Sequence, residues 1–241
     1  RRPQAKVSVS DGALVVAYHG CDATVRDRLV KGELKELTPS ANKYDWPGPG
    51  IYFFENDLER ARQFAQAAHQ NPTKLYTKTP IATPAVVGAV VRISRWLDMT
   101  TQFGLANWVA AYKSLQSSQR KAGKEMPRNE PADGEDATVL LRQLDCAVFT
   151  TLHQMREEDG LPDMQAVRAA FYQGQPLASS TSEFREQTHV QIALRDANCV
   201  VGWFLPPGDK ILTSTAYDAA QERLEAAKRE RTASKRRVAR S

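Results

Sequence analysis

The stretch "QTHVQ" at residues 187–191 places polar side chains at every second position. In a strand, Gln187, His189 and Gln191 would share one face, and the residues between them would share the other. Such alternation beside an apolar run indicates a face that lines a cleft, although a half-exposed edge strand would carry the same pattern. A glutamine there could hydrogen-bond a hydroxyl group, but it could not act as a general base or carry negative charge.

Two earlier stretches could contribute to the same chemistry. "AYHG" at residues 17–20 ends an apolar run with His19 and Gly20, and "GPGIYFFEND" at residues 48–57 delivers Tyr52 directly after a turn. The turn is required because proline lacks a donor and glycine gains little from being ordered. Taken singly, His19 is typical of a satisfied structural histidine and Tyr52 of a core residue.

Short elements must hold these residues in place. The bulky residues at 51–54 predict a buried strand, after which Asn56, with Glu59 three residues later, predicts the cap of a helix. Upstream, residues 13–18 predict a strand that ends at His19–Gly20.

The helix after this first strand is expected to be capped by Asp22 and ended by Gly32. Residues 33–50 then lack periodicity, and so long a connection is typical of a functional or mobile loop. The first ten residues resemble an arm.

The remaining chain mixes strands and helices without a βαβ rhythm, which predicts an α+β domain with a split, mainly antiparallel sheet and flanking helices. We expect strands at 85–94, 188–194 and 199–205, helices at 102–116, 138–158 and 163–172, and an exposed insertion at about 117–137. The 85–94 strand should be central, and the last two strands should form a tight hairpin through residues 195–198.

Composition limits the class of protein. No run is long and apolar enough to span a bilayer and no signal segment opens the chain, so we expect a cytoplasmic protein. The three cysteines are few and widely spaced, which fits reduced thiols. No CxxC, HExxH or clustered Cys/His spacing occurs, so no metal site is expected.

The charge is concentrated at one end. Residues 219–241 hold eight Lys or Arg against three Glu, a net charge of +5, which equals the net charge of all 241 residues. Residues 1–218 are therefore balanced and are expected to form the folded domain, with 219–241 as a basic helical tail.

In this order, "AYHG", "GPGIYFFEND" and the late polar strand resemble the diphtheria-toxin-like ADP-ribosyltransferases, the group that includes the poly(ADP-ribose) polymerase catalytic domain. The resemblance covers residues 13 to about 206, and "GPGIYF" is its most specific part. It implies that NAD is the substrate. It also implies an oxocarbenium-like transition state, in which the bond between ribose and nicotinamide breaks while the enzyme holds nicotinamide and stabilises charge on the ribose.

The resemblance also implies roles for single residues. His19 would hydrogen-bond a ribose hydroxyl of the adenosine half, and Gly20 would let the backbone approach the nicotinamide amide. Tyr52, after Gly50 in the turn, would pack on the nicotinamide ribose and ring. Phe64 lies one position from the family's second stacking aromatic, and core packing explains it equally well.

The long loop and the late strand complete the expected site. Ser40 and Asn42 are placed by position near the adenosine phosphates. Gln191 takes the place of the family's late-strand Glu, and Glu183 or Glu186, in the loop that faces the acceptor in this family, could supply the carboxylate instead. A missing Glu argues against polymer formation and leaves open mono-ADP-ribosylation, NAD hydrolysis or binding without turnover.

The basic tail has three interpretations. Residues 217–235 predict a helix with Leu224 as its one large aliphatic residue, which is typical of a solvated helix. Its cations could instead bind nucleic-acid phosphates without sequence preference, or an acidic partner protein. Bacterial proteins resembling this family often act as toxins or in phage defence, so we expect a nucleic-acid or protein acceptor, and an inhibitory partner protein as a further expectation.

Overall fold

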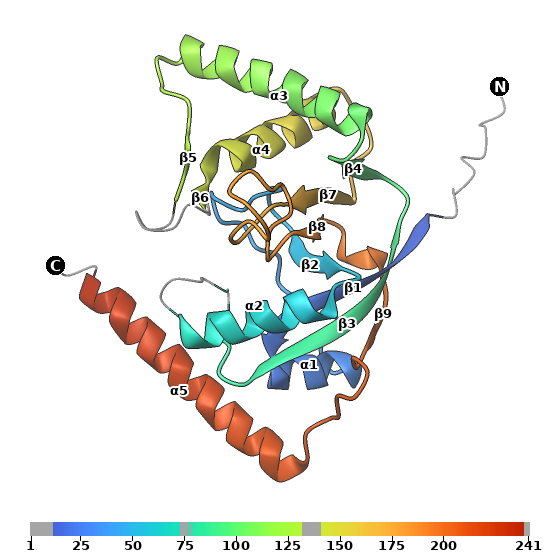
Figure 1. Cartoon of the computed structure of the whole chain (residues 1–241), viewed down its shortest axis with the longest axis vertical. Helices are drawn as coiled ribbons and strands as arrows, with labels where there is room; N and C mark the ends of the chain where they lie inside the picture. Colours follow the sequence, from blue (N-terminus) through green and yellow to red (C-terminus); the bar gives the residue numbers. More distant parts are fainter. Residues whose placement is uncertain (1–11, 73–76, 78, 132–140, 239–241) are drawn as a thin grey trace.

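The computed structural model describes residues 12–72, 77, 79–131 and 141–238 (Figure 1). Its elements, in chain order, are β1 (Ala13–Asp22), α1 (Ala23–Val30), β2 (Ile51–Glu55), α2 (Leu58–Gln70), β3 (Pro84–Ile93), β4 (Trp96–Asp98), α3 (Gln102–Lys121), β5 (Asn129–Glu130), β6 (Leu141–Arg142), α4 (Gln143–Glu158), β7 (Ala166–Phe171), β8 (His189–Leu194), the 3-10 turn η1 (Ala197–Cys199), β9 (Val200–Phe204) and α5 (Ser214–Val238).

Seven of the strands form one sheet in the order β4-β7-β8-β2-β1-β3-β9. Every neighbouring pair is antiparallel except β4 and β7, which are parallel. The described residues thus form an α+β fold with a mainly antiparallel sheet, which confirms the predicted class. β3 pairs on both edges, as a central strand should, although it lies next to the edge strand β9.

The sheet curls until its two ends approach each other. β3 and β4 lie near opposite ends of the strand order, yet only Ser94 and Arg95 separate them in the chain. So short a connection spans at most about 10 Å, and a flat sheet would need more. Gln165, just before β7, holds the junction, because its side-chain oxygen accepts from the backbone N–H groups of Ser94 and Arg95.

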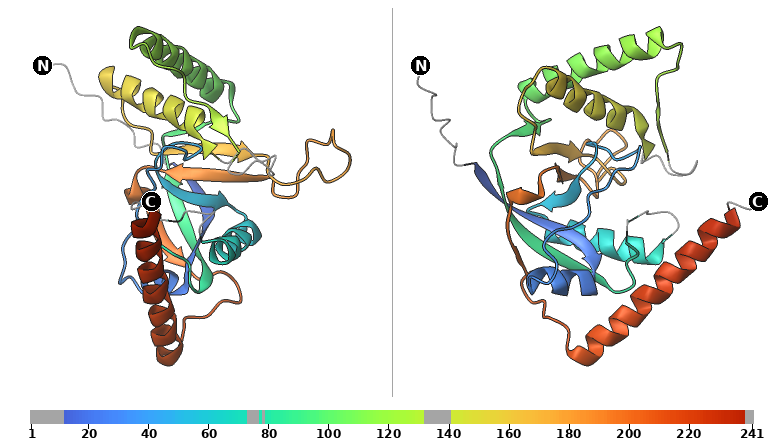
Figure 2. Two further views of the ribbon diagram at one scale, coloured as in Figure 1. Left: turned by 90° about the vertical axis from the view of Figure 1, so that its left-hand side faces the viewer. Right: turned by 180° about the vertical axis from the view of Figure 1, so that it is seen from behind.

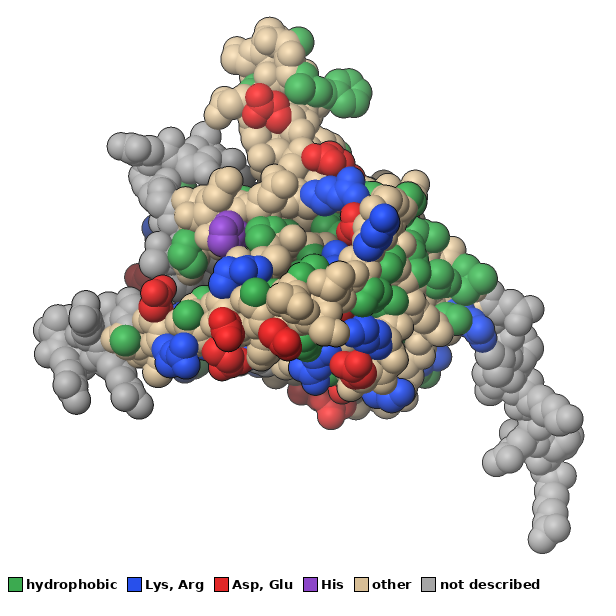
Figure 3. All heavy atoms as spheres, turned by 90° about the horizontal axis from the view of Figure 1, so that it is seen from below, with side chains coloured by type: hydrophobic (Ala, Val, Ile, Leu, Met, Phe, Trp, Pro, Cys, Tyr) green, Lys and Arg blue, Asp and Glu red, His purple; other side chains and the backbone are tan. Residues whose placement is uncertain are grey.

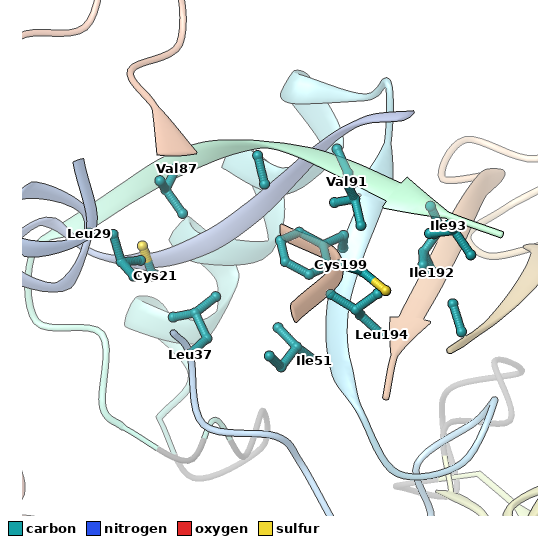
Figure 4. Close-up of a cluster of buried hydrophobic side chains, with 14 residues drawn as sticks. Cys21, Leu29, Leu37, Ile51, Val87, Val91, Ile93, Ile192, Leu194 and Cys199 are labelled. Atoms are coloured by element: carbon teal, nitrogen blue, oxygen red, sulfur yellow. The ribbon is translucent and has the colours of Figure 1, made fainter. Parts of the chain in front are cut away.

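Each face of the curled sheet carries its own core. Figure 4 shows the first core, where Leu29 of α1 meets side chains such as Val87 of β3 and Ile192 and Leu194 of β8. The opposite face is covered by α2 and, over β7 and β8, by α4 with α3 outside it; Phe149 of α4 is one of the buried residues there. Because successive residues of β2 point to opposite faces, Phe53 enters the first core and Tyr52 the second.

Two predicted elements are wrong. Residues 163–172 contain the strand β7 and no helix, because β7 fills the gap between β4 and β8 and buries Val167 and Phe171. Ala, Met and Gln favour a helix locally, but pairing on both edges outweighs that preference. The predicted 188–194/199–205 hairpin is also absent: β8 pairs with β2 and β7, so both its edges are taken, and β9 pairs with β3.

Local signals at the first two helices are mostly right. Asp22 caps α1, accepting from Thr24 N, and Gly32 follows its end with φ +73°. The cap of α2, however, is Asp57, which accepts from Arg60 N, while Asn56 adopts a left-handed φ of 49° in the preceding turn. Asparagine tolerates that conformation better than most residues.

Other predicted boundaries shift. β1 continues to Asp22, so His19 lies inside the strand and not at its end. α3 runs to Lys121, into the predicted insertion, and Met126 packs against the second core. The predicted arm at 1–10 and residues 132–137 of the insertion lie outside the described residues. Cys21, Cys146 and Cys199 are free and buried.

The C-terminal helix α5 exists as predicted but is not solvated all round. It runs along the lower side of the molecule, beside α1 (Figures 1 and 2), and Ala220 and Leu224 are buried. The segment before it is fixed to α1, because Arg26 donates to Lys210 O and Asp27 accepts from Leu212 N. Among the described residues, no helix is long and apolar enough to cross a membrane.

Candidate functional site

His19 has a defined tautomer. Its Nδ1 lies 2.6 Å from the carbonyl oxygen of Tyr52 on the neighbouring strand, and a carbonyl can only accept, so Nδ1 carries the proton. Burial lowers the pKa of His19, and the bond to Tyr52 opposes this only in part. The ring is therefore neutral at pH 7, and Nε2 has a lone pair available to accept a hydrogen bond.

His19 is one of the residues that line a cavity of about 290 Å³. The cavity is bounded by the end of β1, the first turns of α1, residues of the 34–38 loop, Thr77, Thr79 and Ile81, and one face of α5. It includes three charged side chains whose role sequence reasoning missed, namely Arg28, Glu36 and Lys228.

Asp22 also lines the cavity, but its carboxylate already forms hydrogen bonds within the fold. Its buried carboxylate accepts from the backbone and hydroxyl of Thr24 and from the N–H groups of Ala82 and Thr83. These four bonds join the end of β1 to α1 and to the segment before β3. Asp22 therefore shapes the cavity and leaves little capacity to bind a ligand.

The other charged groups of the cavity are more available. Glu36 is exposed and makes no hydrogen bond or ion pair within the described residues, and Arg28 is exposed. Lys228 pairs with Glu225 at 2.8 Å, but both side chains are more than 40 % exposed, so water competes with that pair. The cavity can thus offer a neutral imidazole acceptor, two cations and one carboxylate to a ligand.

The backbone of Tyr52 contacts the His19 ring, but the side chains of the two residues point in different directions. The His19 ring packs edge-on against Phe53, on the first-core face, with centroids 5.8 Å apart. The Tyr52 ring packs on the opposite face, and its hydroxyl donates to Gly48 O at 2.6 Å. Burial raises its pKa well above the usual value. The structure brings together the His19 side chain and the Tyr52 backbone, and Tyr52 does not line the cavity.

Gly20 and Phe64 meet each other. A Cβ on Gly20 would lie 2.6 Å from Ala61 O and 3.1 Å from the Phe64 ring, so α2 packs directly on this glycine. A Cβ on Gly50 would similarly lie 2.9 Å from Leu194 O. Close approach of backbone to backbone accounts for both glycines within the fold.

Ser40 and Asn42 belong to a hydrogen-bonded turn. Asn42 donates from its backbone and its amide to Asp45 and from the amide to Ser40 Oγ, while Ser40 forms a backbone bridge with Gly50. Burial raises the pKa of Asp45, and these bonds lower it in part. The network shapes the loop before β2, away from the cavity lining.

The three residues expected from the late strand lie apart from the cavity. Gln191 lies opposite Phe54, on the face away from the His19 ring. His189 is buried between Phe54 and Phe171; its Nδ1 lies 2.6 Å from Gln187 O, and its Nε2 has no partner among the described residues. Burial is the main cause that lowers its pKa to about 4.

Glu183 and Glu186 belong to the segment between β7 and β8, which projects from the body (Figure 2). Glu186 accepts from Gln175 N there at 3.3 Å, and Glu183 is exposed. Among the described residues, the carboxylate that lines the cavity without a partner is Glu36, in the long loop, and no local sequence pattern distinguishes it. The sequence identified Lys228 only as one cation of a basic helix and gave no sign that it lines a cavity.

Comparison with protein-family models, with curated proteins and with solved structures finds no match for this chain.

Proposed function

We propose that this protein cleaves NAD and transfers a single ADP-ribose to a macromolecule. The observation that carries the proposal is the hydrogen bond between His19 Nδ1 and Tyr52 O, because it leaves Nε2 as an acceptor at the wall of a cavity. A ribose hydroxyl is a matching donor. The resemblance of "AYHG" and "GPGIYF" to the ADP-ribosyltransferases supports the same ligand.

The other groups of the cavity fit the rest of NAD. Arg28 and Lys228 provide positive charge for a diphosphate, which binds guanidinium and ammonium groups through charge-assisted hydrogen bonds. Glu36 provides negative charge, which would stabilise the cation that develops on the ribose as the bond to nicotinamide breaks. In this proposal Glu36 takes the role that the resemblance gives to the late-strand Glu, where this chain has Gln191.

A second candidate is a module that binds NAD or ADP-ribose without reaction. Its specific support is the exposure of Glu36, since catalysis of this kind needs a charge held in a fixed position. Both candidates require saturable NAD binding, and they differ only in the release of nicotinamide.

The test is incubation of the full chain with NAD and measurement of free nicotinamide. We expect release by the wild type and a loss of about 100-fold in His19→Ala, because the transition state loses a fixed hydrogen-bond partner. Glu36→Gln should lower the rate while leaving NAD binding nearly unchanged.

His69→Ala is the matched control. His69 also has its Nδ1 next to a backbone carbonyl, that of Ile81 at 3.0 Å, but its ring does not line the cavity. It should retain full activity. Saturable NAD binding without nicotinamide would favour the binding module, and no NAD binding would reject both candidates.

A further inference from the structure

The cavity is closed on one side by a helix that is weakly attached. Gln221, Leu224 and Lys228, each about one turn from the next on α5, line the cavity that contains His19. Among residues 214–233 of this helix, Ala220 and Leu224 alone are buried. Little apolar surface therefore holds α5 in place, in contrast to α2 and α4, which pack on the sheet.

Two arginines connect α5 to the body through uncharged acceptors. Arg223 donates through Nε and Nη2 to Thr83 Oγ1 at 3.3 and 3.2 Å, and Arg231 donates to Thr77 O at 2.5 Å. A hydrogen bond from guanidinium to an anion is about twice as strong as one to a neutral acceptor. A phosphate that reaches Arg223 therefore competes favourably with its contact to Thr83.

The size of the cavity makes the attachment of α5 important for ligand entry. Ligand pockets range from about 300 to 1,000 Å³, and at about 290 Å³ this cavity lies at the lower limit, too small for a complete dinucleotide. β1, α1 and Leu37, which form other parts of the wall, contribute to the first core, whereas the α5 residues that line the cavity lie outside it. α5 can therefore move without disrupting that core.

We propose that nucleic acid binds α5 through Arg223 and Arg231 and draws the helix outward, so that the cavity widens when a nucleic-acid partner is bound. The opening itself does not depend on the proposed function. The identity of the ligand that then enters, NAD, does rest on it.

The charge distribution favours nucleic acid as the partner. Residues 219–241 hold eight cations and three carboxylates, whereas residues 1–218 hold 25 basic and 25 acidic residues. The view from below, the side on which α5 lies, shows both kinds of side chain at the surface (Figure 3). A regular series of phosphates can engage several cations along one helix and release their counterions. Tyr217 is the one aromatic residue of α5, so binding should tolerate any sequence.

Cys21 provides a direct readout of the opening. It is 5 % exposed and lines the cavity behind α5, whereas Cys146 and Cys199 are buried elsewhere. The experiment is pulsed maleimide labelling of the full chain, with and without poly(U) RNA, with the labelled cysteine located by mass spectrometry. Poly(U) should raise Cys21 labelling severalfold and leave Cys146 and Cys199 unchanged, and added salt should reverse the effect.

Two variants distinguish the specific arginine contacts from general electrostatic attraction. Each substitution in them replaces one arginine by glutamine and so removes one positive charge. Arg223→Gln/Arg231→Gln should label Cys21 faster without RNA and respond little to it. Arg229→Gln removes an exposed cation with no hydrogen bond to the described body, so it should keep Cys21 protected until RNA is added. Binding of RNA is followed separately by fluorescence anisotropy.

RNA binding that leaves Cys21 protected in the wild type would overturn the proposal. Opening by poly-glutamate but not by poly(U) would also overturn it and assign the helix to an acidic protein. Opening by poly(U) without nicotinamide release under any condition would sustain the moving helix and reject the transferase. Nicotinamide release that RNA does not change, with Cys21 still protected, would reject the moving helix alone.

Discussion

The ring of His189 combines burial with an unpartnered nitrogen. Its Nδ1 lies 2.6 Å from Gln187 O, and Nε2 is enclosed near Phe54 and Phe171 without a partner in the part of the chain that the structure describes. Burial, and to a smaller extent the charge of Arg60, lowers the pKa of His189 from 6.5 to about 4. The folded protein must therefore keep this ring neutral under conditions in which the unfolded chain would protonate it.

This difference predicts acid sensitivity. Between pH 6.5 and about 4 the unfolded chain binds more protons at this position, so the free energy of unfolding rises with pH in that window and falls on acidification. The full difference is roughly 3 kcal/mol. Urea unfolding at pH 7 and pH 4.5 should show that His189→Leu, which cannot be protonated, loses less stability on acidification than the wild type.

His153, whose pKa burial lowers to about 3, will keep part of the pH dependence in the variant. His69 is exposed, so the His69→Leu variant should lose as much unfolding free energy on acidification as the wild type. An equal loss of stability in His189→Leu and the wild type would contradict the prediction.

The contact of α2 with β1 depends on one glycine. Gly20→Ala would place a methyl group 2.6 Å from Ala61 O, a backbone atom that can move only with the helix. We expect a loss of about 1–3 kcal/mol in unfolding free energy. Gly202→Ala, also in a strand but with open space at the Cβ position, should be tolerated. A stable Gly20→Ala variant that has lost NAD binding would show that this glycine serves the ligand more than the helix.

Helices and strands that depend on neighbouring residues could be predicted from the sequence. Strands that depend on pairing with distant strands could not. The bulky run at 51–54 and the Asp22 cap need only neighbouring residues, so β2 and α1 lie where expected. β7 lies in a segment of good helix formers and becomes a strand only because β4 and β8 flank it. The candidate site follows the same division: the motif predicts His19, whereas Glu36 and Lys228 come to line one cavity only in the folded chain.

At the scale of the molecule, a buried ion pair fixes the C-terminal segment to α1. Asp27 is fully buried, pairs with Arg26 at 2.7 Å and accepts from Leu212 N. Asp27→Ala leaves the Arg26 charge buried without this partner, and we expect unfolding free energy to fall by about 3–5 kcal/mol. Denaturant titration is the measurement. Glu225→Ala breaks the exposed pair with Lys228 and should cause no measurable change; an equal effect of the two substitutions would contradict the expected role of burial.

The curled sheet determines when the chain can fold during synthesis. β1 and β3 emerge from the ribosome early, but the first core also needs Ile192 and Leu194 of β8. Trp203 of β9 stacks on Phe53 with an interplanar angle of 29°. Pairings this distant in sequence are slow to form, because long loops must close first. The nascent chain therefore carries β1 and β3 without their complete core until β8 and β9 have been translated, and in that interval it depends on chaperones or on rapid synthesis to avoid aggregation.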